Sequence, residues 1–159
     1  MKLLPNEKQI KPFLYEEEKR PWGYYGLYSH NEPCTSKILY IKPQELLSMQ
    51  YHFKRDQFYL ILDHNFVIEY SKIPVPENIV NNPNEAQRFK DLENFLLENL
   101  ITVRAYEGDM FGFHRFVVHR ALYKGPRSYG RILDIAFGEN DELDIVRIKD
   151  KYNRIETSE

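Results

Sequence analysis

The sequence predicts an all-β protein, folded as a single domain. Two observations lead to this prediction. The chain of 159 residues is rich in aromatic side chains, with 12 Tyr and 10 Phe against 7 Gly, and such residues fit the pleated, half-buried surface of a sheet. Short apolar segments also recur at intervals of roughly eight to twelve residues between turn signals, which is typical of a β-sandwich or β-barrel.

The N-terminal third contains an arm and the first strands. We expect residues 1–19 to form an arm that packs through its apolar side chains. Pro21 and Gly23 then mark a turn, because proline and glycine are the strongest breaks in regular structure. The aromatic segment 24–28 is expected to be a strand, and so is the alternating segment 36–42.

The central stretch, residues 46–62, consists of two apolar runs around the charged break 54–56. We interpret it as a β-hairpin. Gln50 and His52 are two residues apart, so they share one face of the first strand. If the turn brings Gln57 opposite them, three polar side chains converge at one end of a sheet.

Imidazole nitrogens and amide oxygens can bind a metal ion. Gln50, His52 and Gln57 could therefore form a metal site, with His119 from far along the chain as a fourth ligand. The Gln-x-His spacing alone is a weak signal, and on its own it is more often a pair of ordinary polar residues on a half-exposed strand.

A helical insertion is expected at about residues 76–100. Asparagines before residue 85 can cap a helix, and apolar residues follow at spacings of three and four: Phe89, Leu92, Phe95, Leu96 and Leu100. That spacing indicates one amphipathic helix. The sequence leaves open whether this helix packs on the β-body or on a partner subunit.

Four further strands complete the predicted domain, which spans residues 20–159. Three of them are expected at residues 66–70, 101–106 and 131–137, and the segment 110–122 is expected to run through a bend to a strand that carries His119.

Composition excludes several classes of protein. The net charge of −2 argues against nucleic-acid binding through bulk charge. The single cysteine, Cys34, excludes an internal disulfide. No apolar run approaches the roughly 20 residues of a membrane helix, and the first residues lack the apolar core of a signal peptide. We therefore expect a cytoplasmic protein with neither nucleic acid nor membrane as a partner.

Four motifs occur in order along the chain. They are Arg20-Pro21-Trp22-Gly23, then Lys42-Pro43 before Leu47-Ser48-Met49-Gln50-Tyr51-His52, then Val118-His119-Arg120, and finally Asp144-Ile145-Val146-Arg147 continuing to Asp150, Tyr152 and Arg154. In this order they resemble the cupin domain of type II mannose-6-phosphate isomerases. That domain is also the C-terminal part of bifunctional mannose-1-phosphate guanylyltransferase/isomerases.

The resemblance implies a cupin double-stranded β-helix, a jelly-roll barrel, carrying the inserted helix. It also implies a divalent metal (Zn, Mn, Co or Ca) bound by Gln50, His52, Gln57 and His119. The family has a glutamate at position 57, and an amide oxygen binds a metal more weakly than a carboxylate does. The family's Pro-x-Gly before the second histidine is replaced here by residues 114–116.

The activity implied is metal-dependent aldose–ketose isomerisation of a phosphorylated sugar, such as mannose 6-phosphate. This chemistry needs a group that moves protons and a cation that stabilises the developing oxyanion. Arg154, which closes the family motif, and Lys151 are the candidates for catalytic residues, with His114 or a metal-bound water as other proton carriers. The candidates for binding the substrate phosphate are Lys42, Lys37, Arg127 and Arg131.

Two alternatives stay open. One is a cupin that binds a sugar or nucleotide-sugar without turning it over, which Gln57 and the altered loop at 114–116 favour. The other is a metal-free nucleotide-sugar epimerase that uses a His–Tyr pair. Cupins of this kind often pair through edge strands, so the resemblance also allows a homodimer.

Overall fold

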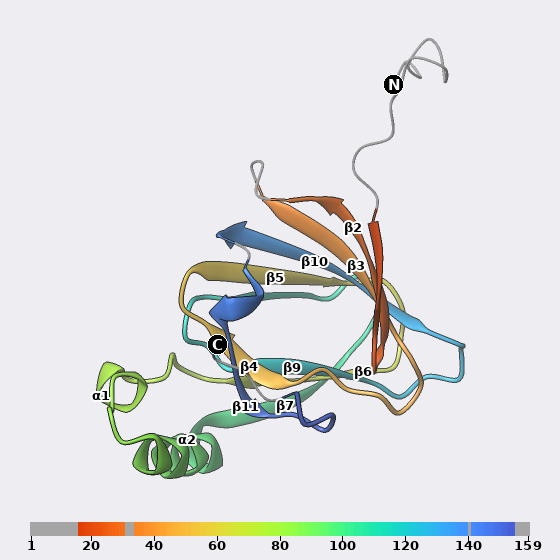
Figure 1. Cartoon of the computed structure of the whole chain (residues 1–159). Helices are drawn as coiled ribbons and strands as arrows, with labels where there is room; N and C mark the ends of the chain where they lie inside the picture. The colour runs from red at the N-terminus through yellow and green to blue at the C-terminus, as the bar shows by residue number, and fades with distance from the viewer. Residues whose placement is uncertain (1–15, 31–33, 140, 155–159) are drawn as a thin grey trace.

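The fold was obtained as a computed structural model that describes residues 16–30, 34–139 and 141–154. Two antiparallel sheets face each other (Figure 1). The six-stranded sheet has the order β1 (Glu16–Arg20), β2 (Gly23–Ser29), β3 (Thr35–Ile41), β10 (Gly130–Gly138), β5 (Arg55–Ile61), β8 (Met110–Phe113). The five-stranded sheet has the order β11 (Ile145–Lys149), β4 (Met49–His52), β9 (His119–Tyr123), β6 (Phe66–Ser71), β7 (Leu100–Ala105).

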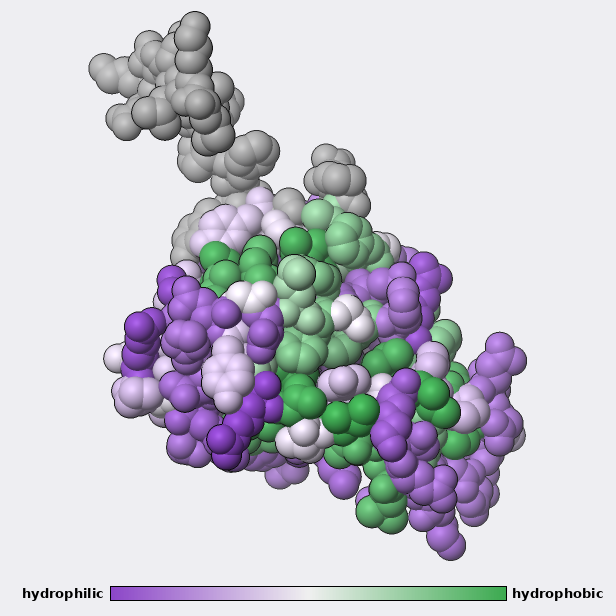
Figure 2. All heavy atoms as spheres, turned by 180° about the vertical axis from the view of Figure 1, so that it is seen from behind, coloured by the Kyte–Doolittle hydropathy of each residue, from purple (hydrophilic) through white to green (hydrophobic). Residues whose placement is uncertain are grey.

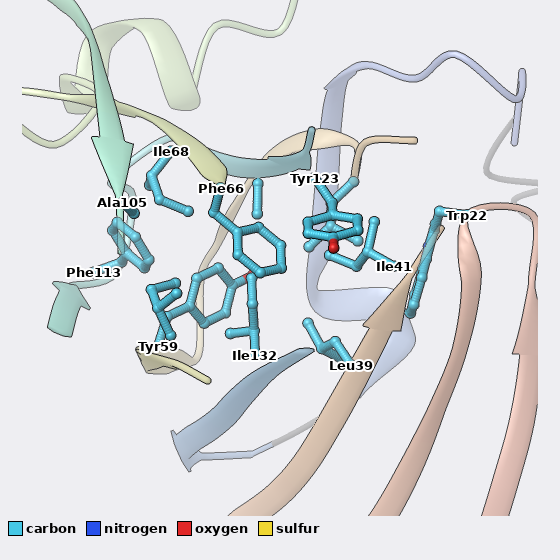
Figure 3. Packing of buried hydrophobic residues seen from close by; sticks show 13 residues of the cluster. Trp22, Leu39, Ile41, Tyr59, Phe66, Ile68, Ala105, Phe113, Tyr123 and Ile132 are labelled. Atoms are coloured by element: carbon cyan, nitrogen blue, oxygen red, sulfur yellow. The ribbon is translucent and has the colours of Figure 1, made fainter. Parts of the chain in front are cut away.

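This arrangement confirms the predicted all-β class. The sheets form an open jelly-roll sandwich, and their inward side chains build the main core (Figure 3). Trp22, Tyr59 and Phe66 are buried in that core. The apolar residues expected to anchor the arm, at positions 13–15, lie outside the described residues, and the arm's last residues belong to β1, which pairs with β2.

Gly23 explains the tight turn after the first strand. Its φ is +152°, and a Cβ atom at this position would lie 1.8 Å from the backbone oxygen of Tyr40. Only glycine avoids that collision. The turn brings β2 back along β1, with Lys19 opposite Tyr24. The close approach at Gly23 also lets β2 lie against β3, where Tyr24 is opposite Tyr40.

The predicted hairpin at 46–62 is wrong. β4 pairs with β9 and β11, whereas β5 pairs with β8 and β10, so the chain crosses from one sheet to the other at Phe53 and Lys54. Two-residue hairpins favour residues with positive φ, and neither linker residue has one. Both strands still turn their alternate residues towards the same interior, from opposite sides.

The insertion lies between β6 and β7, which pair with each other as the arms of a hairpin. It contains two helices where the sequence predicted one: α1 (Glu77–Val80) and α2 (Glu85–Asn99). The side chain of Asn84 caps α2 by accepting a hydrogen bond from the backbone nitrogen of Gln87, at 3.1 Å.

The buried stripe of α2 packs on this chain's own β-body. Leu92, Phe95 and Leu96 form a second apolar cluster with Met49 of β4 and with Val118, which directly precedes β9. None of the helices in the described part of the chain is both long and apolar enough to span a membrane. Apolar side chains also reach the surface, where they gather on the face seen in Figure 2.

Two leucines of α2 offer a matched test of this packing. We expect Leu92→Ala to lower the free energy of unfolding by about 2–5 kcal/mol, because Leu92 is fully buried and its removal leaves a cavity. Leu97 is 86% exposed, so Leu97→Ala should change the value by less than about 0.5 kcal/mol. Urea unfolding followed by circular dichroism measures both, and equal effects would contradict the described packing.

Candidate functional site

The four predicted metal ligands meet between the two sheets. Gln50 of β4 lies opposite His119 of β9 in the register of the five-stranded sheet, and Gln57 approaches from β5 of the other sheet. The Gln57 Oε1 atom lies 3.0 Å from His52 Nε2 and 2.8 Å from His119 Nε2. Gln50 Nε2 lies 3.4 Å from His52 Nε2. Residues from both sheets therefore surround one point.

The hydrogen bonds around His119 fix which atoms face that point. Its Nδ1 lies 3.0 Å from the carbonyl oxygen of Val117. A carbonyl only accepts hydrogen bonds, so Nδ1 carries the proton and Nε2 turns a lone pair inward. Gln57 Nε2 donates to Asp134 Oδ1 at 2.7 Å, so Gln57 Oε1 also points inward. Two acceptors thus face each other with no proton between them.

His52 has a carboxylate behind it. Its Nδ1 lies 3.9 Å from Asp144 Oδ2, and both buried atoms lack a hydrogen-bond partner in the described structure. The other oxygen of Asp144 accepts from the backbone nitrogens of Phe53 and Lys54, at 2.9 Å each. A carboxylate behind an imidazole orients metal-binding histidines in many proteins, and here it favours a proton on Nδ1 and a lone pair on Nε2.

The spacing of these nitrogen and oxygen atoms fits a divalent cation. Ligand atoms about 2.1 Å from a metal and at right angles to each other are about 3 Å apart, and the contacts around Gln57 and the two histidines fall near that value. The set contains two imidazoles and two amides and no carboxylate. Within the described residues, no group of three or more His, Cys, Asp or Glu could hold a metal. The site is therefore neutral, which weakens its hold on a cation.

Burial keeps both imidazoles neutral. The pKa of His52 is lowered to about 2 by desolvation and by the nearby positive charges of Arg55 and a protonated His119. Desolvation lowers the pKa of His119 to about 4, although the hydrogen bond to Val117 partly opposes it. The ring of His119 also stacks on Phe113, with centroids 4.3 Å apart. Both lone pairs are thus available near neutral pH.

A cavity of about 70 Å³ adjoins this site. A single water needs roughly 10–15 Å³, so the space suits an ion with a few waters. Five cationic side chains contribute to its lining: Arg20, Lys37, Arg55, Arg147 and Arg154. Among the lining residues, Asp134 is the one carboxylate, so the wall carries an excess of positive charge.

Two of the predicted substrate and catalytic residues belong to this lining. Lys37 lies over the ring of Tyr25, with its Nζ 4.7 Å from the ring centroid. Arg154 forms a two-point ion pair with Asp150, at 2.8 and 2.7 Å.

Other predicted residues do not line the cavity. Lys151 pairs with Glu45 at 2.8 Å. Arg127 and Arg131 share the buried carboxylate of Asp63, at 2.7 and 2.8 Å. Lys42 follows β3 and is exposed, and His114 is exposed beside Asp56.

Sequence reasoning missed Arg55 and Asp134. Arg55 lies in the charged segment 54–56 that was expected to be a turn, yet it is the buried first residue of β5. Arg55 is two residues before Gln57 and four before Tyr59, so the alternation of a strand puts all three on the same face. This spacing could have predicted that Arg55 points inward. Asp134 lies among apolar residues of β10 and is 7% exposed. A lone acidic residue at an inward position of a strand could have marked it.

The loop that replaces the family's Pro-x-Gly has an unusual backbone. Phe116 stands where the family has glycine, and its φ is +66°, a region that non-glycine residues seldom adopt. Its ring packs near those of Tyr51 and Phe53, and its backbone nitrogen donates to the His52 oxygen at 2.9 Å. This packing holds the strained residue next to the site.

The family model of the mannose-6-phosphate isomerase C-terminal domain matches residues 7–87 of this chain. The chain belongs to this family. The match includes three of the proposed ligands, Gln50, His52 and Gln57. A comparison with curated proteins finds no match.

Solved structures support the cupin fold. CapF, a capsular polysaccharide assembling protein from Staphylococcus aureus, has a TM-score of 0.58 at 10% identity, over 87% of this chain and 33% of CapF. KdgF from Halomonas sp. has a TM-score of 0.56 at 11% identity, over 87% and 96%. CENP-C from Drosophila melanogaster, bound to CAL1, has a TM-score of 0.55 at 12% identity, over 77% and 76%.

These likenesses concern the fold alone, and this cupin spans about a third of CapF.

The neutral histidines predict a pH dependence of stability. The folded pKa of His119 lies below its usual 6.5, so the unfolded chain takes up this proton first and acid favours unfolding. In a metal chelator, we expect the free energy of unfolding to fall from about pH 6.5 down to about pH 4, by up to about 1.4 kcal/mol per pH unit for this histidine.

The measurement is urea unfolding across this range for the original chain and for His119→Asn, which should show a shallower slope. The comparison of the two proteins is needed because burial raises the pKa of Asp134, which gives a contribution of opposite sign. Exposed His64 provides the control, His64→Asn. Parallel curves for His119→Asn and the original chain would contradict the prediction.

Proposed function

We propose that this cupin is a metal-dependent isomerase of a phosphorylated sugar, interconverting an aldose and a ketose such as mannose 6-phosphate and fructose 6-phosphate. The observation that carries the proposal is the convergence of the His52, His119 and Gln57 lone pairs beside a cationic cavity. Membership in the isomerase-related family supports it.

Gln50, His52, Gln57 and His119 would hold the metal. When bound, a divalent cation supplies polarisation of the sugar oxygens and stabilises the oxyanion that develops during enolisation. Gln50 Oε1 accepts from Ser48 Oγ at 2.6 Å in this structure, so its amide would have to rotate to offer that oxygen. Asp134 positions Gln57 through the hydrogen bond to its nitrogen.

The cationic lining would bind the phosphate. Guanidinium groups match phosphate oxygens in two-point contacts, and Arg55 is suited to this because it is buried and close to the ligand set. Its NH1 donates to the backbone oxygen of Asp141 at 3.1 Å, which holds the side chain in place.

We assign proton transfer to Asp134. Its carboxylate lines the cavity, and burial raises its pKa towards the range in which a carboxylate works as a general base. Lys151 and His114, the candidates from sequence, are engaged by Glu45 and Asp56 away from the lining.

One observation favours a second candidate, a cupin that binds the sugar without turning it over. Gln57 leaves the ligand set without a negative charge, and a weakly bound metal would be lost at low concentration. The isomerase and the binding protein share the same ligand and differ in turnover.

Restoring the family's carboxylate tests the metal site. In Gln57→Glu, two carboxylates would face each other where Gln57 now donates to Asp134, so we choose the double variant Gln57→Glu/Asp134→Asn, in which asparagine donates instead. We expect this variant to bind Mn²⁺ at least about tenfold more tightly, because it moves the negative charge from Asp134 to position 57, where a carboxylate oxygen would contact the metal directly.

Isothermal titration calorimetry with Mn²⁺ measures this effect. His119→Ala should abolish binding, and His64→Ala, which changes an exposed histidine, should leave it unchanged. An unaltered affinity in the folded double variant would refute the assignment of Gln57 as a ligand.

The substrate assignment predicts a specific loss. We expect Arg55→Gln to raise KM for fructose 6-phosphate about tenfold or more, since a buried charge-assisted contact to phosphate is lost. Arg127→Gln, outside the cavity, should leave KM unchanged. A coupled assay with Mn, Co, Zn or Ca added follows the reaction. Binding of fructose 6-phosphate without turnover under all four metals would favour the second candidate.

A further inference from the structure

Tyr59 of β5 lies between the main core and the cavity beside the candidate site. It is 1% exposed, and its ring packs in the core nearly perpendicular to that of Phe113, with centroids 5.2 Å apart (Figure 3). The ring is also nearly perpendicular to that of His119, with centroids 5.9 Å apart. Tyr59 also belongs to the lining of the cavity. A core residue thus reaches the space next to the predicted metal ligands.

The hydroxyl of Tyr59 has no hydrogen-bond partner among the described residues. A buried tyrosine normally finds one, because an unpaired polar group in the interior costs free energy. The described side-chain atoms that are both sealed from solvent and unpartnered do not include this oxygen, so it is reached from the cavity that Tyr59 lines. Phenylalanine would fill the core equally well without the unpaired group. The hydroxyl therefore indicates a role towards a molecule bound in the cavity.

The strand register places Tyr59 beside the group to which we assign proton transfer. Tyr59 is directly opposite Asp134 in the pairing of β5 with β10, and both side chains are buried. The Cβ atoms of residues directly opposite in an antiparallel pair are about 5 Å apart. Gln57, two residues before Tyr59, shares its face of the strand. The reacting end of a sugar bound at the ligand atoms can therefore contact the phenol and the carboxylate together.

We propose that Tyr59 is a catalytic residue whose hydroxyl donates a hydrogen bond to the sugar oxygen that becomes an oxyanion during enolisation. This role rests on the proposed isomerase function. Asp134 takes a proton from the carbon next to the carbonyl group, the electron pair of that C–H bond forms the C=C bond, and the carbonyl electron pair moves onto the oxygen. A phenol stays protonated at neutral pH, so Tyr59 donates to this oxygen and keeps its own proton.

Such a donor acts on the transition state more than on the bound sugar. A hydrogen bond with one charged partner is about twice as strong as a neutral one, so the contact strengthens as charge develops on the oxygen. Removal of one donor to an oxyanion typically lowers kcat by about 10²–10³-fold. The loss of the Tyr59 hydroxyl should therefore affect kcat and the affinity for an enediolate analogue, with little effect on KM.

Two substitutions of tyrosine by phenylalanine form a matched pair, because each removes one buried hydroxyl. We expect Tyr59→Phe to leave the urea midpoint of unfolding unchanged or higher, since no hydrogen bond within the described chain is lost. Tyr123 is also 1% exposed in the same core, but its hydroxyl accepts from the backbone nitrogen of Arg127 at 3.3 Å. Tyr123→Phe should therefore lower the midpoint by roughly 0.5 M. Circular dichroism follows both transitions.

Calorimetry on the Mn²⁺-loaded protein measures the affinity for two probes, fructose 6-phosphate and 5-phosphoarabinonohydroxamate, whose hydroxamate group mimics the enediolate. Tyr59→Phe should weaken hydroxamate binding at least about tenfold and change the affinity for fructose 6-phosphate by less than about threefold. Its affinity for Mn²⁺ should stay unchanged. In the coupled assay, kcat should fall by about 100-fold. Tyr123→Phe should match the original chain in all of these measurements.

Unchanged hydroxamate affinity in Tyr59→Phe would overturn the assignment of Tyr59 and leave the isomerase proposal intact. A midpoint lowered as far as that of Tyr123→Phe would also overturn it, because the hydroxyl would then serve the fold. A different result separates the failure of the proposed function. If the original chain binds neither probe, or turns over no substrate, with Mn, Co, Zn or Ca, then the isomerase proposal fails and the catalytic role of Tyr59 fails with it.

Discussion

The interior of the molecule depends on the side chain of Gln57. Its nitrogen donates to Asp134 on the neighbouring strand, and its oxygen faces both imidazoles of the opposite sheet. Gln57 thus contacts Asp134 on its own sheet and both histidines on the opposite sheet, so one side chain links the two sheets at the candidate site. The family has a negatively charged glutamate at position 57, whereas here the carboxylate belongs to Asp134, which accepts a hydrogen bond from Gln57. The Gln57 oxygen still faces the two histidines, but the four predicted metal ligands carry no charge.

The sequence was sufficient to predict the alternation of faces, and together with the family resemblance it predicted that Gln50, His52, Gln57 and His119 would meet, but it did not predict the strand pairing. Residues 46–52 and 55–61 each show which side chains face inward, because the period of a strand is local. Their partners are not local: β4 pairs with β9 and β11, which lie far along the chain. The hairpin was therefore the natural prediction and the wrong one. The four side chains still meet, because two strands in opposite sheets point their inward residues at the same space.

Charge in the sequence was a poor guide to burial. Arg55 stands between Lys54 and Asp56 and resembles a solvated turn, yet its position in β5 carries it into the cavity. Arg127 and Arg131 resemble phosphate ligands, and both meet the buried carboxylate of Asp63. Whether an arginine reaches the cavity or an ion pair depends on residues far away in the sequence, which local patterns do not show. The family motif was more informative for Arg154, which lines the cavity.

The crossing of the chain between sheets at Phe53 and Lys54 has a consequence for ligand binding. Because His52 and Gln57 flank this crossing and belong to different sheets, a cation bound by both would link the two sheets. Binding free energy at such a point adds directly to the free energy that keeps the sandwich closed. The thermal midpoint of the protein would then report occupancy of the site, whether or not any reaction follows.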